Sequence, residues 1–345
     1  MHVAAPKAQR SLPLELWPMN TPLYGLNSLR EVLTRHDILR VVRNACVQHA
    51  HDKVISAKSG ELLFQNPPGD CHIRFGYFRG APTFVIKVAM GFYENPTRGL
   101  ETNNGLMMVF SSLTGNLIAI LNDEGWLTSW RTAAAGALAA KAGAPSRVTA
   151  LGILGSGHQA ELQALWAAHL LGTQRVVIWG RVKEKAERLA ESLQLHALTA
   201  HAVSTVEDVF KQCNVVITCT PSTQPIVLAH LVKPGTHIVA LGADSLGKQE
   251  LDPHILAQAS VIMTDDHQQC AERGELAHAL HAGLIREEVC VALGHVLAGN
   301  SPGRLSDHDI TVADLTGLAA QDIAIATLAV EMSQLSPSNS ALPPP

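Results

Sequence analysis

The segment from Leu151 to Ala160 constrains the fold of this chain more than any other feature. It reads Leu-Gly-Ile-Leu-Gly-Ser-Gly-His-Gln-Ala, follows an apolar run and opens a helical one. Gly155 permits a tight turn, Gly157 lets a phosphate approach the backbone, and Ala160 stands where helix and strand pack closely. A helix N-terminus also favours an anion. The pattern predicts a dinucleotide-binding turn, and the alternative is an ordinary glycine turn in an α/β domain.

Strand and helix patterns alternate around this turn. Short apolar runs predict strands at 148–154, 175–179, 215–220, 237–241 and 261–264. Helical patterns separate the first three, and the one over 183–193 is charged on its outer face. Continuous apolar strands with intervening helices are typical of a doubly wound parallel sheet. We therefore predict an α/β fold of the Rossmann type.

The first third of the chain has a different pattern. Residues 72–78 and 83–90 predict one hairpin, and residues 106–110 and 117–121 predict a second, so this part holds a mostly antiparallel sheet. Apolar positions within 31–50 predict a packed helix pair. An alanine-rich helix follows, with Thr128 and Ser129 as candidate N-caps, Gly143 as a C-terminal cap and Pro145 as a breaker. Its small side chains permit very close packing.

Composition excludes several classes of protein. The 30 acidic residues outnumber the 26 basic ones, which argues against a nucleic-acid partner. Apolar runs are too short for the ~20 residues of a membrane span. The six cysteines are scattered, and the first seven residues lack an apolar core, so we expect reduced thiols and a cytoplasmic location. Histidines and cysteines form no metal-ligand spacing, so no metal is expected. A charged fraction of only 16% hints at an oligomer interface.

The end of the second predicted strand bears on the choice of cofactor. An acidic residue there would bind the ribose 2′-hydroxyl of NAD, but the sequence reads Gly180-Arg181-Val-Lys183. Gly180 leaves room, and Arg181 with Lys183 nearby pairs well with a 2′-phosphate, which favours NADP over NAD. The alternatives are that Arg181 stacks on adenine or is a solvated charge at a helix start.

Other polar residues stand where a ligand would lie. Thr220 is the last residue of a predicted strand. We expect it either to lie beside a cofactor or to belong to a plain turn. Asp244 follows another buried strand between Gly242 and Gly247, at the sheet edge where α/β proteins bind ligands; the alternative is a cap on the next turn.

Two cations in the earlier part of the chain are candidates of the same kind. Lys87 stands among apolar residues in a strand, either on a solvent face or as a functional charge. Arg131 falls in the first turn of the alanine-rich helix, where a cation opposes the helix dipole unless an anion is held there.

Together these segments resemble the ornithine cyclodeaminase/μ-crystallin family. The matching runs are 86–95, 105–107, 131–136, 155–160 and 242–248, with Asp266, Gln269, 274–275 and 311–312. The resemblance implies a dimer with a shared β-structure and a substrate cleft between two domains. It implies a substrate-binding and dimerisation domain, of α+β type, over 1–130 and 318–345, and an NAD(P)-binding Rossmann domain over 131–317.

The resemblance also implies roles for individual residues. Lys87 and Arg131 would hold the substrate carboxylate, with Lys87 part of the catalytic set, and Asp244 would be the catalytic acid/base. His158 and Gln159 would meet the pyrophosphate through their N–H groups. The residues expected to bind or line the cofactor are Thr102, Arg131, Thr132, Gly155, Gly157, His158, Gln159, Gly180, Arg181, Lys183, Thr220, Leu241 and Lys248.

One departure from the family pattern bears on the reaction. Cyclodeaminases carry an arginine upstream of the lysine in a Pro-x-Arg-like context, and residues 62–68 lack it. Arg74, in Cys71-His-Ile-Arg, would take its place, as in members that reduce imines. We therefore expect an NAD(P)H-dependent reductase of imino acids such as Δ1-pyrroline-2-carboxylate or Δ1-piperideine-2-carboxylate. The alternatives are reduction of open-chain imines of 2-oxo acids, redox-neutral cyclodeamination with ammonia release, and a non-catalytic NADP-dependent binding protein.

Overall fold

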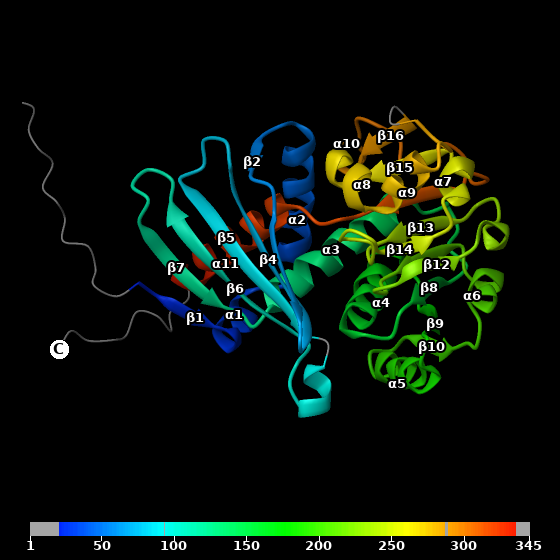
Figure 1. Cartoon of the computed structure of the whole chain (residues 1–345), viewed down its shortest axis with the longest axis horizontal. Coiled ribbons are helices and arrows are strands. Elements are labelled where there is room, and N and C mark those ends of the chain that lie inside the picture. Colours follow the sequence, from blue (N-terminus) through cyan, green and yellow to red (C-terminus); the bar gives the residue numbers. More distant parts are fainter. Residues whose placement is uncertain (1–20, 93, 287–288, 336–345) are drawn as a thin grey trace, which may run out of the picture.

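The computed structural model contains two large β-sheets and a small two-stranded one (β12 with β14), with helices around and between them (Figure 1). It describes residues 21–92, 94–286 and 289–335. The first seven residues, on which part of the expected location rests, lie outside these ranges. No helix within them is long and apolar enough to cross a membrane.

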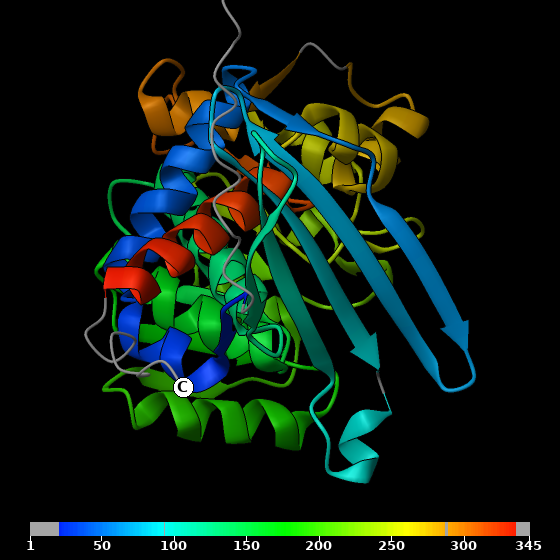
Figure 2. The ribbon, with the colours of Figure 1, turned by 90° about the vertical axis from the view of Figure 1, so that its left-hand side faces the viewer.

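The first sheet confirms both predicted hairpins. Its strand order is β1-β7-β6-β5-β4-β2, with β3 also paired to β4, and all its pairs are antiparallel except β1 with β7. Helices α11 and α2 run along one side of it (Figure 2). The strands are β1 (Leu23–Gly25), β2 (Val54–Ser56), β3 (Gly60–Gln65), β4 (Pro68–Phe78), β5 (Thr83–Phe92), β6 (Asn103–Ser111) and β7 (Leu117–Asn122). The helices beside them are α1 (Leu26–Val32), α2 (Arg35–Ala50), η1 (Asn95–Arg98) and α11 (Ala319–Leu335).

The second sheet is wholly parallel, with the order β10-β9-β8-β11-β13-β17-β15-β16, which confirms the doubly wound prediction. Its strands are β8 (Leu151–Leu154), β9 (Arg175–Trp179), β10 (Thr199–Ala202), β11 (Val215–Thr218), β13 (His237–Ala240), β15 (Val261–Thr264), β16 (Cys290–Ala292) and β17 (Thr311–Asp314). Beside it lie β12 (Thr223–Val227) and β14 (Gln249–Leu251). The helices are α4 (His158–Leu171), α5 (Lys183–Gln194), α6 (Val206–Gln212), η2 (Ala229–Leu231), α7 (His254–Gln258), α8 (His267–Arg273), α9 (Glu275–His281) and α10 (Leu293–Ala298).

Three predicted strands are shorter in the structure than in the sequence analysis. β8 begins at Leu151 rather than at residue 148, because its partners pair with it only from Val176 and Val215 onward. β11 ends at Thr218 rather than at residue 220, and β13 at Ala240 rather than at 241. The residues after these two strand ends turn into the cavity described below.

The alanine-rich helix α3 (Trp126–Gly143) corrects three predictions. It begins before Thr128 and Ser129, which are therefore not its N-cap. Gly125 takes that place with φ +80°, and the Asp123 carboxylate accepts a hydrogen bond from the Leu127 N–H at 2.7 Å. Gly143 is its last helical residue rather than a cap. Arg131 consequently lies in the second turn, where the helix dipole no longer explains its placement.

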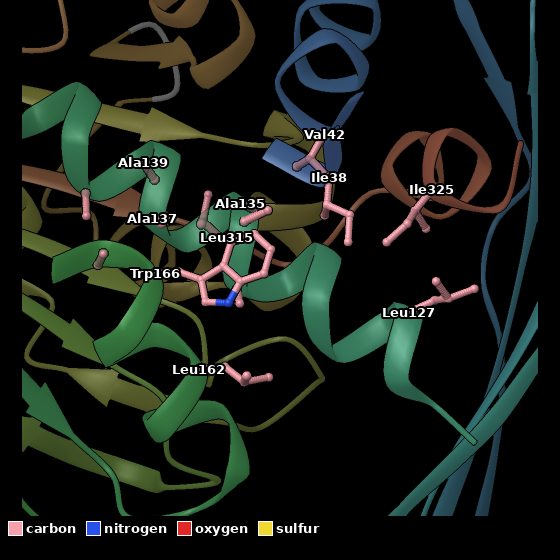
Figure 3. Packing of buried hydrophobic residues seen from close by; sticks show 14 of the residues in the cluster. Ile38, Val42, Leu127, Ala135, Ala137, Ala139, Leu162, Trp166, Leu315 and Ile325 are labelled. Carbon is pink, nitrogen blue, oxygen red and sulfur yellow. The ribbon is translucent and has the colours of Figure 1, made fainter. Parts of the chain in front are cut away.

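Helix α3 packs against elements of both sheets, as its small side chains predicted (Figure 3). Ala135, Ala137 and Ala139 are almost fully buried, and Trp166 of α4 lies against this helix. A Cβ on Gly136 would lie 2.2 Å from the Gln163 amide oxygen, so a larger residue would displace this side chain and its hydrogen bond to the Thr132 carbonyl. The proposed domain limits at residues 131 and 317 remain a prediction, since α3 belongs to the core of both halves.

Candidate active site

A cavity of about 850 Å³ lies between the two sheets. β4 and β6 supply one wall, the N-termini of α3 and α4 a second, and the loops after β11 and β13 a third. It brings together many of the residues singled out from the sequence. These are Arg74, Thr102, Arg131, Thr132, Gly157, His158, Gln159, Thr220, Leu241, Asp244 and Lys248.

The other predicted site residues lie outside the cavity wall. Lys87 is buried at 2% exposure among side chains next to the wall. Gly155 and Gly180 are in or behind the glycine turn, while Arg181 and Lys183 are exposed beyond it. Lys183 pairs with Glu187 on its own helix at 3.5 Å.

Three buried cations gather beside the cavity, and two of them pair with one carboxylate. Arg74 of β4 and Lys87 of β5 are directly opposite in the sheet register, so their side chains share one face. Lys87 Nζ lies 2.8 Å from Asp322 Oδ2, and Arg131 Nε lies 2.8 Å from Asp322 Oδ1. Arg131 Nη1 also donates to Gln321 Oε1 at 3.2 Å. The predicted cations therefore converge, and α11 supplies their anion.

Lys87 and Arg131 pair directly with Asp322, while Asp322, Asp244 and Asp265 all act on Arg74 through their charge. The cluster therefore gathers three cations in a buried place where one carboxylate is directly paired. Burial lowers the pKa of Lys87 to about 7; Asp322 opposes this shift, and Arg131 and Arg74 add to it. Arg74 Nη2 donates to the Thr316 carbonyl at 3.0 Å, but its Nε has no hydrogen-bond partner within the described ranges. A carboxylate bound in the cavity would add a favourable charge next to Arg74 and Arg131, which both line it.

The sequence analysis missed Asp322 and Gln321. Their signal was two adjacent polar residues inside an otherwise apolar helix, because buried polar side chains must find partners. Burial alone would raise the pKa of Asp322, but Arg131 and Lys87 outweigh it and hold the pKa below its ordinary value.

The glycine turn has the geometry that a diphosphate needs. Gly155 has φ +139°, which favours glycine, and a Cβ there would lie 2.9 Å from Cys219 Sγ. A Cβ on Gly157 would meet nothing within 4 Å, and Gly157 caps α4 without a side-chain hydrogen bond. The first N–H groups of α4 therefore face open space in the cavity, which fits a phosphate group. The Gln159 side chain donates to the Ser129 carbonyl at 3.1 Å, which leaves its backbone N–H for the ligand.

Glu250, which the sequence analysis did not single out, fixes the wall that carries Thr220. It accepts hydrogen bonds from Thr218 Oγ1 at 2.6 Å, from both the N–H and the Oγ1 of Thr220, and from the Gly242 N–H at 2.8 Å. The Thr220 hydroxyl thus points its proton at Glu250. One buried carboxylate thus holds together the segments that follow β11 and β13. Its burial raises the pKa of Glu250 above the ordinary value.

Asp244 forms an ion pair at the cavity edge rather than a cap. Its Oδ1 lies 2.7 Å from Lys248 Nζ and also accepts from Ser245 Oγ at 3.3 Å. Burial would raise the pKa of this carboxyl, but the charge and hydrogen bond of Lys248 outweigh it and hold the pKa below its ordinary value. Asp244 is therefore a carboxylate at neutral pH. Its side chain is 46% exposed.

The comparisons with known proteins relate this fold to oxidoreductases whose structures contain bound NAD. An archaeal alanine dehydrogenase dimer with bound NAD has a TM-score of 0.83 at 31% identity, covering 91% of this chain and 96% of that one. The iminosuccinate reductase of Paracoccus denitrificans in complex with NAD⁺ gives the same TM-score at 30% identity, over 91% of this chain and 96% of that one.

The sequence comparisons agree with this class. The Paracoccus reductase is 36% identical over 74% of this chain and 79% of its own length. The alanine dehydrogenase of Archaeoglobus fulgidus is 40% identical over 69% of this chain and 73% of its own length. The model of the ornithine cyclodeaminase/mu-crystallin family matches residues 30–335, so this chain belongs to that family, and the resemblance is confirmed.

Replacing Asp322 with Asn tests the buried charge cluster. Removing one partner of a buried ion pair costs about 3–5 kcal/mol of unfolding free energy. Without Asp322 the pKa of Lys87 falls below about 7. The added penalty therefore grows as the pH falls below about 7, where wild-type Lys87 is protonated more fully than in the variant, and it vanishes at higher pH, where both native forms have lost the proton. We expect urea unfolding to show a larger loss at pH 6 than at pH 9. Glu331→Gln, an exposed carboxylate on the same helix, is the control. Equal losses for D322N at both pH values would contradict this account.

Proposed function

We propose that this protein is an NAD(P)H-dependent reductase that transfers hydride to the C=N bond of an imino acid. The observation that carries the proposal is the buried cluster of Arg74, Lys87 and Arg131 beside a cavity that also holds the glycine turn and Asp244. The relatives named for imine reduction and amino acid dehydrogenation support the same chemistry.

Arg74 and Arg131 hold the substrate carboxylate in this proposal. Both line the cavity, and a guanidinium group offers several N–H donors in a fork that matches a carboxylate. Lys87, behind them, adds charge and fixes Asp322. A carboxylate clamped by two arginines has one orientation, which sets the face of the adjoining C=N group.

Asp244 stabilises the positive charge of the protonated C=N group. Because the pKa of Asp244 lies below its ordinary value, it enters the reaction as an anion rather than as an acid. Lys248, at 2.7 Å, is then the group that holds a proton at this place. A bound nicotinamide supplies the hydride, and the residues described here orient the acceptor and stabilise its charge.

The cofactor-binding residues follow from the cavity wall. The N–H groups of Gly157, His158 and Gln159 meet the diphosphate, and Thr220 and Leu241 line the inner end. Thr102, Thr132 and Lys248 complete that wall. We propose a preference for NADPH, because Arg181 is exposed just after Gly180 and no acidic residue stands there.

Asp244→Asn tests the catalytic role. We expect kcat/KM for imine reduction to fall about 10²–10³-fold, since a neutral amide cannot stabilise the cationic nitrogen. Cofactor binding, followed by energy transfer from tryptophans including Trp126 of the cavity wall, stays unchanged. A variant within threefold of the wild-type rate would show that position 244 is not part of the reaction.

Arg181→Ala tests the cofactor preference. Losing a charge-assisted contact to the 2′-phosphate raises KM for NADPH about tenfold or more and leaves KM for NADH nearly unchanged. Arg188→Ala, an exposed arginine on α5, the helix that follows Arg181, is the matched control. If both cofactors weaken equally, Arg181 does not read the 2′-position.

The substrate we propose is a cyclic imino acid such as Δ1-pyrroline-2-carboxylate or Δ1-piperideine-2-carboxylate, whose products belong to proline and related amino acid metabolism in the cytoplasm. Stoichiometric loss of NADPH absorbance with added imine distinguishes this reaction from redox-neutral cyclodeamination. The latter would release ammonia with no net cofactor change.

We further propose a homodimer built on the open face of the first sheet. Phe75 and Tyr77 alternate with Arg74 along β4, so they lie on the face away from α11. Phe84 stacks on Phe110 at 4.9 Å, and a hollow of about 710 Å³ lies over Phe75, Tyr77 and Phe84. An apolar face of this kind is typical of a subunit interface.

Phe84→Lys tests this interface. A charge in the centre of an apolar contact must be desolvated, so we expect the wild type to sediment as a dimer and the variant as a monomer. Leu195→Lys, at an apolar residue exposed beyond α5, is the control and stays dimeric. A monomeric wild type, or a dimeric F84K, would contradict the proposed interface.

A further inference from the structure

The turn between β17 and α11 forms the part of the cavity wall that contacts the arginines. Leu315, Thr316 and Gly317, the residues that follow β17, all line the cavity. The Thr316 carbonyl accepts a hydrogen bond from Arg74 Nη2 at 3.0 Å. The backbone of this turn therefore touches one of the two arginines that hold the substrate carboxylate in our proposal.

Gly317 brings this backbone close to both arginines. Its φ is +83°, a conformation that favours glycine. A Cβ at this position would lie 2.6 Å from Arg74 Nη1 and 3.1 Å from Arg131 Nη1. Because both arginines are buried, an added methyl group would have to push a guanidinium group out of its place. The shape of the turn and the positions of the two guanidinium groups thus depend on each other.

The carboxylate of Asp265 holds the turn in this shape. Asp265 directly follows β15, the neighbour of β17 in the parallel sheet, so it lies beside the chain that leaves β17. Its Oδ2 accepts a hydrogen bond from the Gly317 N–H at 2.7 Å, and its Oδ1 accepts from the N–H and the hydroxyl of Thr316 at 3.1 and 3.3 Å. Oδ1 also accepts from the Asp266 N–H at 2.9 Å. The side chain is 4% exposed, so these bonds are shielded from water.

We propose that Asp265 is a positioning residue for carboxylate recognition. By holding the Thr316 and Gly317 N–H groups it fixes the carbonyl and the backbone against which Arg74 rests. Asp265 acts through the turn and takes no part in hydride transfer. The inference rests on the proposed function, because the arginines that it positions are those assigned there to the substrate carboxylate.

Asp265 also acts on Arg74 through its charge, and this effect has the opposite sign. If charge alone mattered, removing the carboxylate would leave a more positive site and tighten the binding of an anion. Loss of the hydrogen bonds to the turn would instead release Arg74 from its position and weaken that binding. The direction of the change therefore separates positioning from simple electrostatics.

Calorimetry with two planar ligands tests the inference without turnover. Pyrrole-2-carboxylate and pyrrole-2-carboxamide have nearly the same shape, and only the first is an anion. Each is titrated into protein saturated with NAD⁺ or NADP⁺, whichever binds more tightly. We expect the wild type to bind the carboxylate at least about tenfold more tightly than the carboxamide, because bonds between arginine and an ionised acceptor are the stronger ones.

Asp265→Asn replaces one acceptor oxygen of the turn with an N–H donor. We expect Kd for the carboxylate to rise about tenfold, the size of one lost hydrogen bond to a charged group, and Kd for the carboxamide to stay within about threefold. A variant that is merely less folded would weaken both ligands alike. Asp307→Asn is the control, since Asp307 is an exposed carboxylate that accepts the Ser146 N–H at 2.8 Å.

Gly317→Ala tests the same contact without changing any charge, and it decides the matter if D265N does not fold. The added Cβ displaces Arg74, so we expect Kd for the carboxylate to rise about tenfold or more. Gly299→Ala is the matched control, because Gly299 has φ +81° and a Cβ there would meet nothing within 4 Å.

Carboxylate binding in D265N that equals or exceeds that of the wild type would overturn the inference, as would equal weakening of the two ligands. Wild-type affinity in G317A, or a wild type without preference for the carboxylate, would also overturn it. If the protein nevertheless reduces imines, the proposed function stands. If the carboxylate is bound through Asp265 and no imine is reduced, the proposed function fails and the positioning role stands.

Discussion

The contact of Asp322 with Lys87 and Arg131 is the interaction on which the rest of the structure depends. It joins the first sheet, α3 and α11, three elements far apart in the sequence, at one buried point. One carboxylate keeps two cations paired in a place where unpaired charge is costly. Arg74 lies beside them on the same face of the sheet and lines the cavity, where it can meet an anionic ligand.

The two halves of the molecule divide the remaining chemistry. The parallel sheet presents the open N-terminus of α4 and, through Glu250, a rigid pair of strand ends after β11 and β13. The antiparallel sheet presents Arg74, which lies on β4 with His72 and Asp70 in the cavity wall. Helix α3 packs closely on both sheets and carries Arg131. Because its buried alanines are closely packed and resist compression, α3 fixes the distance between the parallel sheet, which binds the nucleotide in our proposal, and the antiparallel sheet, which binds the substrate.

Local patterns predicted the parts that depend on neighbours in sequence. The glycine turn, the two hairpins and the parallel strands β9 and β15 follow from period and glycine placement alone. The start of α3 did not, because Gly125 caps it through backbone geometry while Thr128 and Ser129 resemble caps. Asp322 was missed because its role comes from Arg131, 191 residues away, and no periodicity encodes such a contact. Glu250 was missed for the same reason.

The central claim is that a carboxylate-anchored C=N carbon receives hydride inside this cavity. The most direct measurement uses NADPH carrying deuterium at the transferred position, a cyclic imino acid, and mass spectrometry with NMR of the product. The account predicts one deuterium on the product carbon that bears both the nitrogen and the carboxylate, with one NADPH consumed for each product formed. Product without deuterium at that carbon, or ammonia release with NADPH unchanged, would contradict it.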